Sequence, residues 1–489
     1  MCFILIFSCK EEISNTGTEN PPITKDTTAT ISGLEYVFDI EKVPTLYVDI
    51  STAEWNTFLN NFDKNSYNEE YIHADLVFRK EQKSDTLKNI GFRLRGNTSR
   101  CRPEGSTGET HNSVNPDWHH AHFSLKLNKY VKGQKLHGVE KINLKWFKDD
   151  PNYVREVYCY DLFERFGVWT SPQSSYCRLY LRIKEDNKWI YYGVHQLLES
   201  VDEEYLKNRI SGFKDADGNL WKANWGADFE NADMSRMGVE TVTLTSTYRP
   251  VYDLKSDEEN LTSAKNQLAA FITNFNSKQG DEFKTWLNNA MDVPLFLKTY
   301  AVSVMCGMWD DYWNNSNNFY FYFNAAGKFY FIPYDYDNTL GTSLLMDDSG
   351  KQDLLNWGKS TNPLVKKIIG IAEYKALYVG YVNELCRADK DLFYSDKSIT
   401  RITKWQNMIR DFVSNDTGED MSIYDSPAFG ETARITGWFP APIITLPYAR
   451  SICRKNIRDY IILFISMLLF FIILTSSLLT FVTVYRLFS

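Results

Sequence analysis

The sequence is short of two features that define common protein classes, patterned cysteine and excess positive charge. Its eight cysteines form no C-x-x-C pair and no zinc-ligand spacing, which argues against a disulfide scaffold or a zinc module, although one long-range disulfide stays open. Lys and Arg number 54 against 62 Asp and Glu, a net charge of −8. Because a general nucleic-acid binder needs a basic face to neutralise phosphates, we expect no nucleic-acid partner. The sequence also has no internal repeat.

Hydrophobic residues, by contrast, are abundant at 43%, and 15% of all residues are aromatic. This composition predicts a large packed core and not a disordered chain. The aromatic content is typical of sheet structure or of stacking surfaces for carbohydrate-like ligands, and composition does not choose between them. A length of 489 residues has room for two or three average domains or for one elaborated domain.

Both ends of the sequence have patterns of membrane-directed segments. Residues 1–9 are an apolar run that ends in a cysteine, as in a bacterial lipoprotein signal, and the polar residues 10–33 then form a flexible tether. An uncharged run at 461–484 is long enough for a transmembrane helix. We therefore expect an exported lipoprotein at the cell membrane or envelope, with the membrane as a partner. The positive charges before residue 461 favour a cytoplasmic main domain instead, so the side of the membrane stays open, and an altered tail is a third explanation.

Between these ends, alternating apolar residues predict strands, and helical periodicity predicts helices. The expected strands are 45–50, 71–79, 86–95, 122–127, 141–147, 175–183, 189–198, 319–323 and 328–333. The expected helices are 52–60, 154–166, 260–277, 280–289 and 293–305, with mainly helices over 363–412. The fold class is therefore α+β, with a strand-rich N-terminal half and a helix-rich C-terminal half.

The hairpin segment 308–340 contains the strongest candidate for a site. Asp310 and Asn318 precede its first strand, and Asp335 and Asp337 follow its second strand. Because a hairpin folds back on itself, the residues before it and after it can lie side by side. Carboxylates and amides gathered in this way are typical of a Mg²⁺ site, whose open positions commonly carry phosphates. The alternative is that these residues only form turns at strand ends.

A second candidate lies upstream, where Arg93, Arg95 and Arg100 surround Gly96. Glycine allows a close approach of the backbone, and several guanidinium groups can bind a polyphosphate through bidentate hydrogen bonds. A solvated basic turn is the alternative for any one of these arginines.

Lys126 stands in an otherwise apolar strand, as a lysine that binds nucleotide phosphates would, and Glu199 is a candidate for its ion-pair partner. The alternatives are a solvent-facing lysine on an amphipathic strand and an ordinary acidic residue at the start of a helix.

Taken together, seven blocks in chain order resemble the CotH kinase family, the spore-coat protein H type of atypical kinase. With the lipoprotein-type start, the chain resembles a bacterial lipoprotein member of that family. The blocks are RLRGNTSR at 93–100, FSLKL at 123–127, DDPNYVR at 149–155, YGVHQLLESVD at 192–202, LWK at 220–222, WD at 309–310 with NFYFY at 318–322, and FIPYDYDN at 331–338. The resemblance extends over roughly residues 45–450.

This resemblance implies a divergent protein-kinase-like fold over residues 34–458, and ATP- and Mg²⁺-dependent transfer of phosphate to Ser or Thr of an envelope or surface protein. It implies that Asp310 is the catalytic-loop aspartate, and that Asp335, Asp337 and Asn318 bind the metal. It also implies a nucleotide-binding set of basic residues with one acidic partner, namely Arg93, Arg95, Arg100, Lys126, Glu199 and Lys222.

The sequence departs from ordinary protein kinases, because it has no GxGxxG loop, no HRD tripeptide and no DFG tripeptide. Asp311 follows Asp310 directly, and the gap from Asp310 to Asn318 is longer than in many relatives, so which aspartate acts stays open. Two alternatives to a protein kinase also remain. One is a non-catalytic surface or adhesion module that keeps the fold, and the other is a kinase for a sugar or lipid head group, which the aromatic residues permit.

Overall fold

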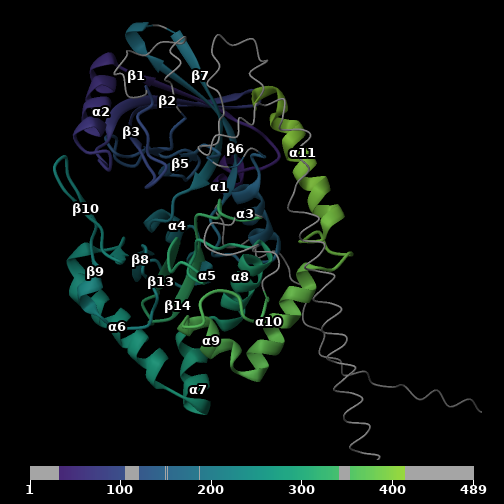
Figure 1. Cartoon of the computed structure of the whole chain (residues 1–489). Helices are drawn as coiled ribbons and strands as arrows, with labels where there is room; N and C mark the ends of the chain where they lie inside the picture. Colours follow the sequence, from purple (N-terminus) through teal and green to yellow (C-terminus); the bar gives the residue numbers. More distant parts are fainter. Residues whose placement is uncertain are drawn as a thin grey trace, which may run out of the picture.

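The computed structural model describes residues 32–104, 120–148, 150, 152–186, 188–340 and 353–413. These residues form two parts, a β-barrel built from the first half of the chain and a second sheet accompanied by helices (Figure 1). Residues 200–202 connect the last barrel strand to the second part. The expected α+β class, with strands concentrated in the N-terminal half, is confirmed.

Seven strands close the barrel in the order β1-β2-β3-β4-β5-β7-β6. Their bounds are β1 (Thr45–Ile50), β2 (Ile72–Lys80), β3 (Lys83–Leu94), β4 (Phe123–Lys126), β5 (Lys141–Lys145), β6 (Ser174–Ile183) and β7 (Lys188–Glu199). The barrel closes where β1 lies parallel to β6, with Leu46 opposite Leu179. Because alternate residues of a strand point to the same face, Leu46, Val48 and Ile50 are all fully buried in the barrel core.

Three helices accompany the barrel strands along the chain, α1 (Ser32–Val37), α2 (Thr52–Lys64) and α3 (Arg155–Arg165). α3 begins where the carboxylate of Asp150 accepts hydrogen bonds from the N–H groups of Val154 (2.8 Å) and Arg155 (2.7 Å), which have no partner within the helix. The helix ends before Gly167, whose φ of 75° favours glycine. The ring of Phe163 on α3 lies 4.9 Å from that of Tyr336, so this helix contacts the second part of the chain.

The second sheet has the strand order β14-β13-β8-β12-β9, with a separate small hairpin of β10 and β11. The bounds are β8 (Asn219–Ala223), β9 (Met237–Gly238), β10 (Thr241–Val242), β11 (Thr247–Tyr248), β12 (Tyr252–Leu254), β13 (Phe319–Phe323) and β14 (Phe329–Pro333). The helices are α4 (Glu203–Lys207), α5 (Ile210–Phe213), α6 (Leu261–Ser277), α7 (Gly280–Ala290), α8 (Val293–Met305), α9 (Pro363–Ile369), α10 (Ala372–Leu385) and α11 (Ser395–Val413).

Every residue of β13 and β14 is buried, which explains their continuous aromatic sequence. The rings of Phe319 and Phe331 stack at 4.9 Å, and those of Phe321 and Phe329 stack at 5.5 Å. A sheet that is covered on both faces does not alternate between apolar and polar residues. In this hairpin the aromatic content therefore forms mainly core, and Tyr320 also lines a cavity.

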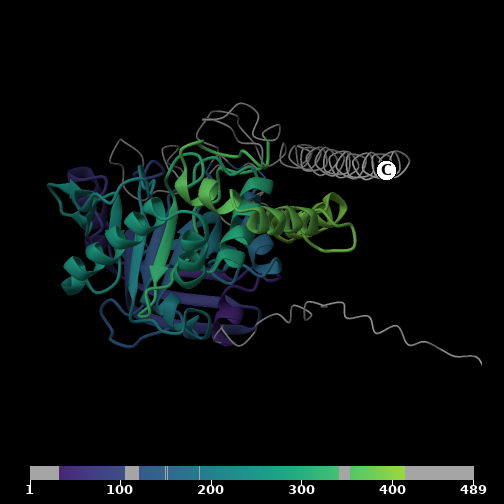
Figure 2. The ribbon, with the colours of Figure 1, turned by 90° about the horizontal axis from the view of Figure 1, so that it is seen from below.

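The last described helix, α11, lies at the side of the molecule in both ribbon views (Figures 1 and 2). It is joined to the barrel where the Tyr191 hydroxyl donates a hydrogen bond of 2.8 Å to the carbonyl of Phe412. A helix from the end of the described chain thus packs on a strand from its first half.

The membrane-directed segments expected at 1–9 and 461–484 lie outside the described residues, as does all of the expected tether 10–33 except residues 32 and 33. Among the residues that are described, no helix combines the length and apolar character needed to cross a membrane.

Candidate functional site

A cavity of about 680 Å³ lies between the barrel and the second sheet. This volume is within the range of roughly 300–1,000 Å³ that is usual for small-molecule sites. The barrel contributes the turn after β3 and the connection 200–202, whereas the second part contributes β8, the segment before β13 and the segment after β14. Its lining includes Arg93, Arg95, Gly96, Asn97, Lys141, Lys222, Trp225, Arg249, Asn318 and Asp335.

Lys145, the last residue of β5, is surrounded by three carboxylates, one of which, Asp335, lines this cavity. Its Nζ lies 2.5 Å from Oε2 of Glu156 on α3, forms an ion pair with Asp335, and lies 3.5 Å from Oδ2 of Asp337. The side chains of Lys145 and Glu156 are only 5% and 3% exposed. Burial lowers the pKa of an ammonium, but the three acidic neighbours outweigh it and raise the pKa of Lys145 well above its usual value. Lys145 is therefore a permanent positive charge in the site.

The two aspartates after β14 keep about a third of their side chains exposed, unlike Lys145 and Glu156. Burial tends to raise the pKa of Asp335, but the charge and hydrogen bond of Lys145 hold that pKa below its usual value. For Asp337, burial together with the neighbouring carboxylates outweighs Lys145 and raises the pKa to about 8. The pKa values of these two carboxyl groups, which are two residues apart, are therefore shifted in opposite directions.

Helix α3 holds the backbone of the segment that carries Asp335 and Asp337. The N–H of Asp335 donates to the hydroxyl of Tyr160 (3.0 Å), and the N–H of Tyr336 donates to Oε1 of Glu156 (3.1 Å). Asp335 has a φ of 65°, a left-handed conformation that costs energy in a residue other than glycine and that is common at functional sites. Glu156 therefore orients both the lysine and the segment that carries the aspartates.

The residues present fit a divalent cation. Carboxylate oxygens of Glu156, Asp335 and Asp337 lie within 4.8 Å of one another. Among the described residues, Oδ2 of Asp335 and Oδ1 of Asn318 accept no hydrogen bond, and both residues line the cavity. Carboxylate and amide oxygens are the ligands that Mg²⁺ prefers.

Asp310 is held by three amides. Asn315 donates to its Oδ1 at 2.5 Å, while Asn318 and Asn338 donate to its Oδ2 at 3.1 Å and 3.4 Å. Burial raises the pKa of Asp310, against the hydrogen bond from Asn315. The hairpin thus brings the segments before and after it together, as the sequence predicted.

Asp311 has a different environment. It is 1% exposed, and its Oδ1 accepts a hydrogen bond of 2.9 Å from the N–H of Trp313. These contacts hold the loop, whereas the Asp310 side chain stays partly exposed. Of the two aspartates between which the sequence did not choose, Asp310 is therefore the better candidate for contact with a substrate.

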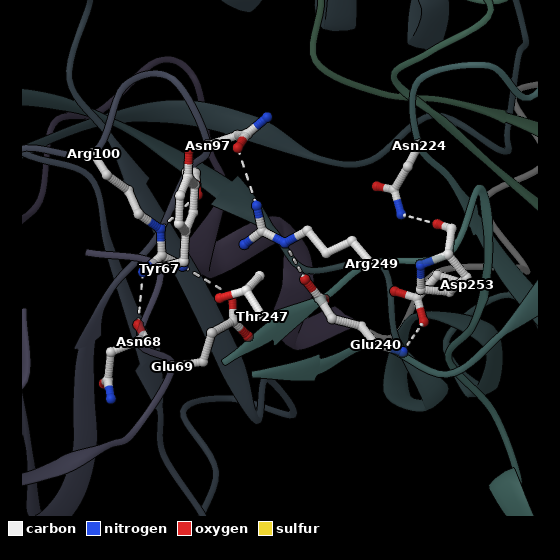
Figure 3. A network of polar contacts seen from close by, with 12 residues as sticks. Tyr67, Asn68, Glu69, Asn97, Arg100, Asn224, Glu240, Thr247, Arg249 and Asp253 are labelled. Atoms are coloured by element: carbon white, nitrogen blue, oxygen red, sulfur yellow. Dashed lines mark hydrogen bonds and ion pairs between the residues drawn. The ribbon is translucent and has the colours of Figure 1, made fainter. Parts of the chain in front are cut away.

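The three predicted arginines have separate environments. Arg95 donates to the hydroxyl of Tyr334 at 2.7 Å, and Arg93 pairs with Glu69 at 3.0 Å; both line the cavity. Arg100 is not among the lining residues, because its guanidinium is used by the carbonyls of Gly96 (2.6 Å) and Asn68 (2.6 Å) and by Glu69. Its position beside Asn68 and Glu69 is visible in Figure 3.

Gly96 allows this turn to form. Its φ is 101°, and a Cβ at this position would lie 2.4 Å from Oγ of Ser99. The turn is held from the opposite wall by Arg249, which donates to Oδ1 of Asn97 at 3.0 Å and pairs with Glu240 at 2.5 Å (Figure 3).

Lys222 on β8 lines the cavity and has no hydrogen-bond or ion-pair partner within the described ranges. Burial and the nearby charge of Lys255 lower its pKa. An ammonium in this environment is stabilised by an incoming anion.

The expected ion pair between Lys126 and Glu199 is wrong. Both carboxylate oxygens of Glu199 accept hydrogen bonds from Arg209, at 2.8 Å and 2.7 Å, and the two side chains are almost fully buried. Lys126 pairs across the sheet with Lys141 and Gly91 and is not a lining residue of the cavity. The buried lysine and its acidic partner are Lys145 and Glu156 instead.

Sequence reasoning missed Lys145 and Glu156, although a signal was present. Lys145 lies within the predicted strand 141–147 and is the last residue of the observed strand β5, and Glu156 lies in the first turn of the predicted helix 154–166. A lysine at the end of a strand followed by a helix with a buried acid is the arrangement that could have identified them.

The sequence profile described as CotH kinase protein matches residues 92–434, so the chain belongs to this family. The expected family is thereby confirmed. The chain is also similar to "Spore coat protein homolog 1" of Rhizopus delemar, with 20% identity over 314 residues. The match includes 63% of this chain and 44% of that relative, so the chain spans less than half of the relative's length.

Proposed function

We propose that the protein is an ATP- and Mg²⁺-dependent phosphotransferase of the CotH type that modifies Ser or Thr hydroxyls of an envelope or surface protein. Membership of the CotH kinase protein family supports a kinase-like role. The observation that carries the proposal is the set of contacts made by Lys145, which joins an acid on a helix to two acids after a hairpin.

The order of these parts along the chain is that of protein kinases. A strand lysine comes first, then a helix glutamate that pairs with it, then an aspartate and an asparagine before a hairpin, and finally an aspartate after the hairpin. Here these are Lys145, Glu156, Asp310 with Asn318, and Asp335. This order is our reason for proposing a divergent protein-kinase-like fold over residues 34–458.

Each residue then has a distinct part in the proposed reaction. Lys145 and Arg95 neutralise the nucleotide phosphates, and Lys222 adds an unpaired ammonium on the opposite wall. Asp310, oriented by Asn315 and Asn318, accepts a hydrogen bond from the attacking hydroxyl and fixes its direction. Such positioning and charge neutralisation supply most of the catalysis in phosphoryl transfer.

Asp335, Asp337 and Asn318 would hold Mg²⁺, which when bound neutralises charge on the phosphates of the nucleotide. The free oxygens of Asp335 and Asn318 in the cavity support this assignment. Glu156 is engaged by Lys145 and serves to orient it.

For the location, the name of the Rhizopus delemar relative, a spore coat protein homolog, supports a surface or envelope protein. The substrate hydroxyl would then belong to another protein of the same compartment. A small-molecule acceptor and a non-catalytic module are the alternatives that an activity assay separates.

The experiment that tests the function combines the full chain with labelled ATP and Mg²⁺, and measures autophosphorylation, transfer to a protein acceptor and thermal stabilisation by the nucleotide. We expect all three in the wild-type protein. In Asp310→Asn we expect stabilisation by the nucleotide without transfer. A wild-type protein that neither binds nor uses the nucleotide would make the chain a non-catalytic module.

A further inference from the structure

Trp225 is the most exposed large hydrophobic residue of the described chain, at 73%, and it lines the cavity. It lies two residues beyond the end of β8 and three residues after Lys222. Exposing an indole to water is unfavourable, and aromatic residues that remain exposed beside a concave site commonly bind a partner. Its position therefore requires an explanation that packing of the chain does not supply.

The backbone around Trp225 is firmly held, although its side chain has no hydrogen-bond or ring partner among the residues that the structure describes. The N–H groups of Gly226 and Ala227 both donate to the carbonyl of Ser316 at 2.9 Å. The side-chain amide of Asn224 donates to the carbonyl of Pro250 at 2.7 Å, and the guanidinium of Arg236 donates to the carbonyl of Gly226. The indole is thus presented at a fixed place.

The contact with Ser316 shows where Trp225 lies relative to the residues of the proposed reaction. It lies in the loop between Asp310 and Asn318, and its φ of 54° is in the left-handed region. Through Ser316, the Trp225 backbone is attached to the loop that holds Asp310, the residue proposed to position the attacking hydroxyl. Lys145, at the end of β5, belongs to the barrel side.

We propose that Trp225 determines specificity for the acceptor, by stacking against an apolar or aromatic side chain of a polypeptide close to its Ser or Thr hydroxyl. This inference rests on the proposed function, because it names the acceptor of that reaction. The acceptor segment crosses the mouth of the cavity, with its hydroxyl towards Asp310 and its apolar side chain on the indole.

The surroundings of Trp225 suit a peptide side chain better than a sugar. The neighbouring lining residues Pro250 and Val251 offer no side-chain hydrogen bonds, and the amide nitrogen of Asn224 is already used. A sugar ring stacked on the indole would obtain no hydrogen bond from the side chains of Pro250 and Val251, and the Oδ1 of Asn224 is left on that residue to accept one. An apolar side chain requires no hydrogen bond.

The experiment compares the full-length wild-type protein, Trp225→Ala and Tyr248→Ala. Tyr248 is the matched control, because it is an exposed aromatic (52%) in the same part of the chain that does not line the cavity. The acceptors are peptides with one Ser, flanked either by Gly or by a single Phe placed at successive positions. We expect Trp225→Ala to lower kcat/KM for the best Phe-containing peptide by about 10- to 30-fold, the usual effect of removing an aromatic anchor. The Gly-flanked peptide, the nucleotide-induced thermal shift and all results with Tyr248→Ala should stay unchanged.

The other outcomes overturn the inference in distinguishable ways. Equal losses with both peptides would make Trp225 a structural residue, and a weakened nucleotide-induced shift would assign it to the nucleotide base. Preference of the wild-type protein for a free sugar or lipid head group would refute the polypeptide acceptor while keeping the phosphotransferase. Absence of both nucleotide binding and transfer in the wild-type protein would refute the proposed function itself, and this inference with it.

Discussion

Replacing Lys145 by Met removes the only cation within 4 Å of the three clustered carboxylates among the described residues, with little change in volume. Glu156 is 3% exposed and cannot recover its hydration when the lysine is lost. Removing one partner of a buried ion pair costs about 3–5 kcal/mol, because the other charge stays buried without compensation. We expect the free energy of unfolding of Lys145→Met to fall by this amount, and nucleotide binding and transfer to be lost.

The matched control is Lys126→Met, which changes the other candidate lysine on the neighbouring strand β4. Lys126 has no ion-pair partner within the described chain, so its replacement should change the free energy of unfolding by no more than about 0.5 kcal/mol. Nucleotide binding should be unchanged, because Lys126, unlike Lys145, contacts none of the three clustered carboxylates and does not line the cavity.

Guanidinium chloride unfolding, followed by tryptophan fluorescence, measures both stabilities, and the nucleotide-induced thermal shift measures binding. The double variant Lys145→Met, Glu156→Gln separates the ion pair from general damage. Since Gln carries no charge, we expect it to recover about 1–3 kcal/mol relative to the sum of the two single effects. Equal effects of the Lys145 and Lys126 substitutions, or strictly additive losses in the double variant, would refute the central role of Lys145.

Three further predictions concern other residues of the site. Asp310→Asn should reduce transfer by at least about 100-fold, while circular dichroism and nucleotide binding stay unchanged; full activity would remove Asp310 from the mechanism. The guanidinium groups of Arg93 and Arg100 outweigh burial and lower the pKa of Glu69 from 4.5 to about 2. The charged Glu69 carboxylate therefore stabilises the fold above pH 4.5, and this stabilisation is lost as the pH falls towards 2. Relative to Glu69→Gln, the wild-type protein should be more stable by about 3 kcal/mol at pH 7 and by about 1 kcal/mol at pH 3, measured by urea unfolding, whereas a difference independent of pH would contradict the pairing. Gly96→Ala should cost about 1–3 kcal/mol and weaken nucleotide binding, because its φ of 101° is strained for alanine, and an unchanged melting temperature would show that the turn is adaptable.

Local structure could be predicted from the sequence because each element carries its own signal. The apolar run 293–305 has an Asp at its N-terminal cap and is a helix with those bounds, and the aromatic strands before and after 324–327 form the expected hairpin. The hairpin signal also brought the two acidic clusters together correctly, because its geometry depends only on neighbouring residues.

Closure of the barrel could not be predicted in this way. The parallel pairing of β1 with β6 joins residues more than 120 positions apart, and no local pattern in either strand names its partner. The cavity could not be predicted from the sequence either, because its walls come from the turn after β3, from β8 and from the segment after β14. The turn after β3 was predicted as a basic cluster, the segment after β14 as an acidic cluster, and β8 only as the LWK block at 220–222, but their common enclosure is a property of the whole fold.

Local sequence patterns do not distinguish the two candidate lysines. Lys126 and Lys145 both end a short strand of alternating apolar residues, β4 and β5, and these two strands lie side by side. The strands differ in the element that comes after each of them, since β5 leads into α3 and its buried Glu156, whereas β4 leads into a tight turn. A buried acid has a large desolvation cost unless a cation is paired with it, and Lys145 at the end of β5 is the cation that lies 2.5 Å from Glu156. The buried acid therefore pairs with Lys145 and not with Lys126.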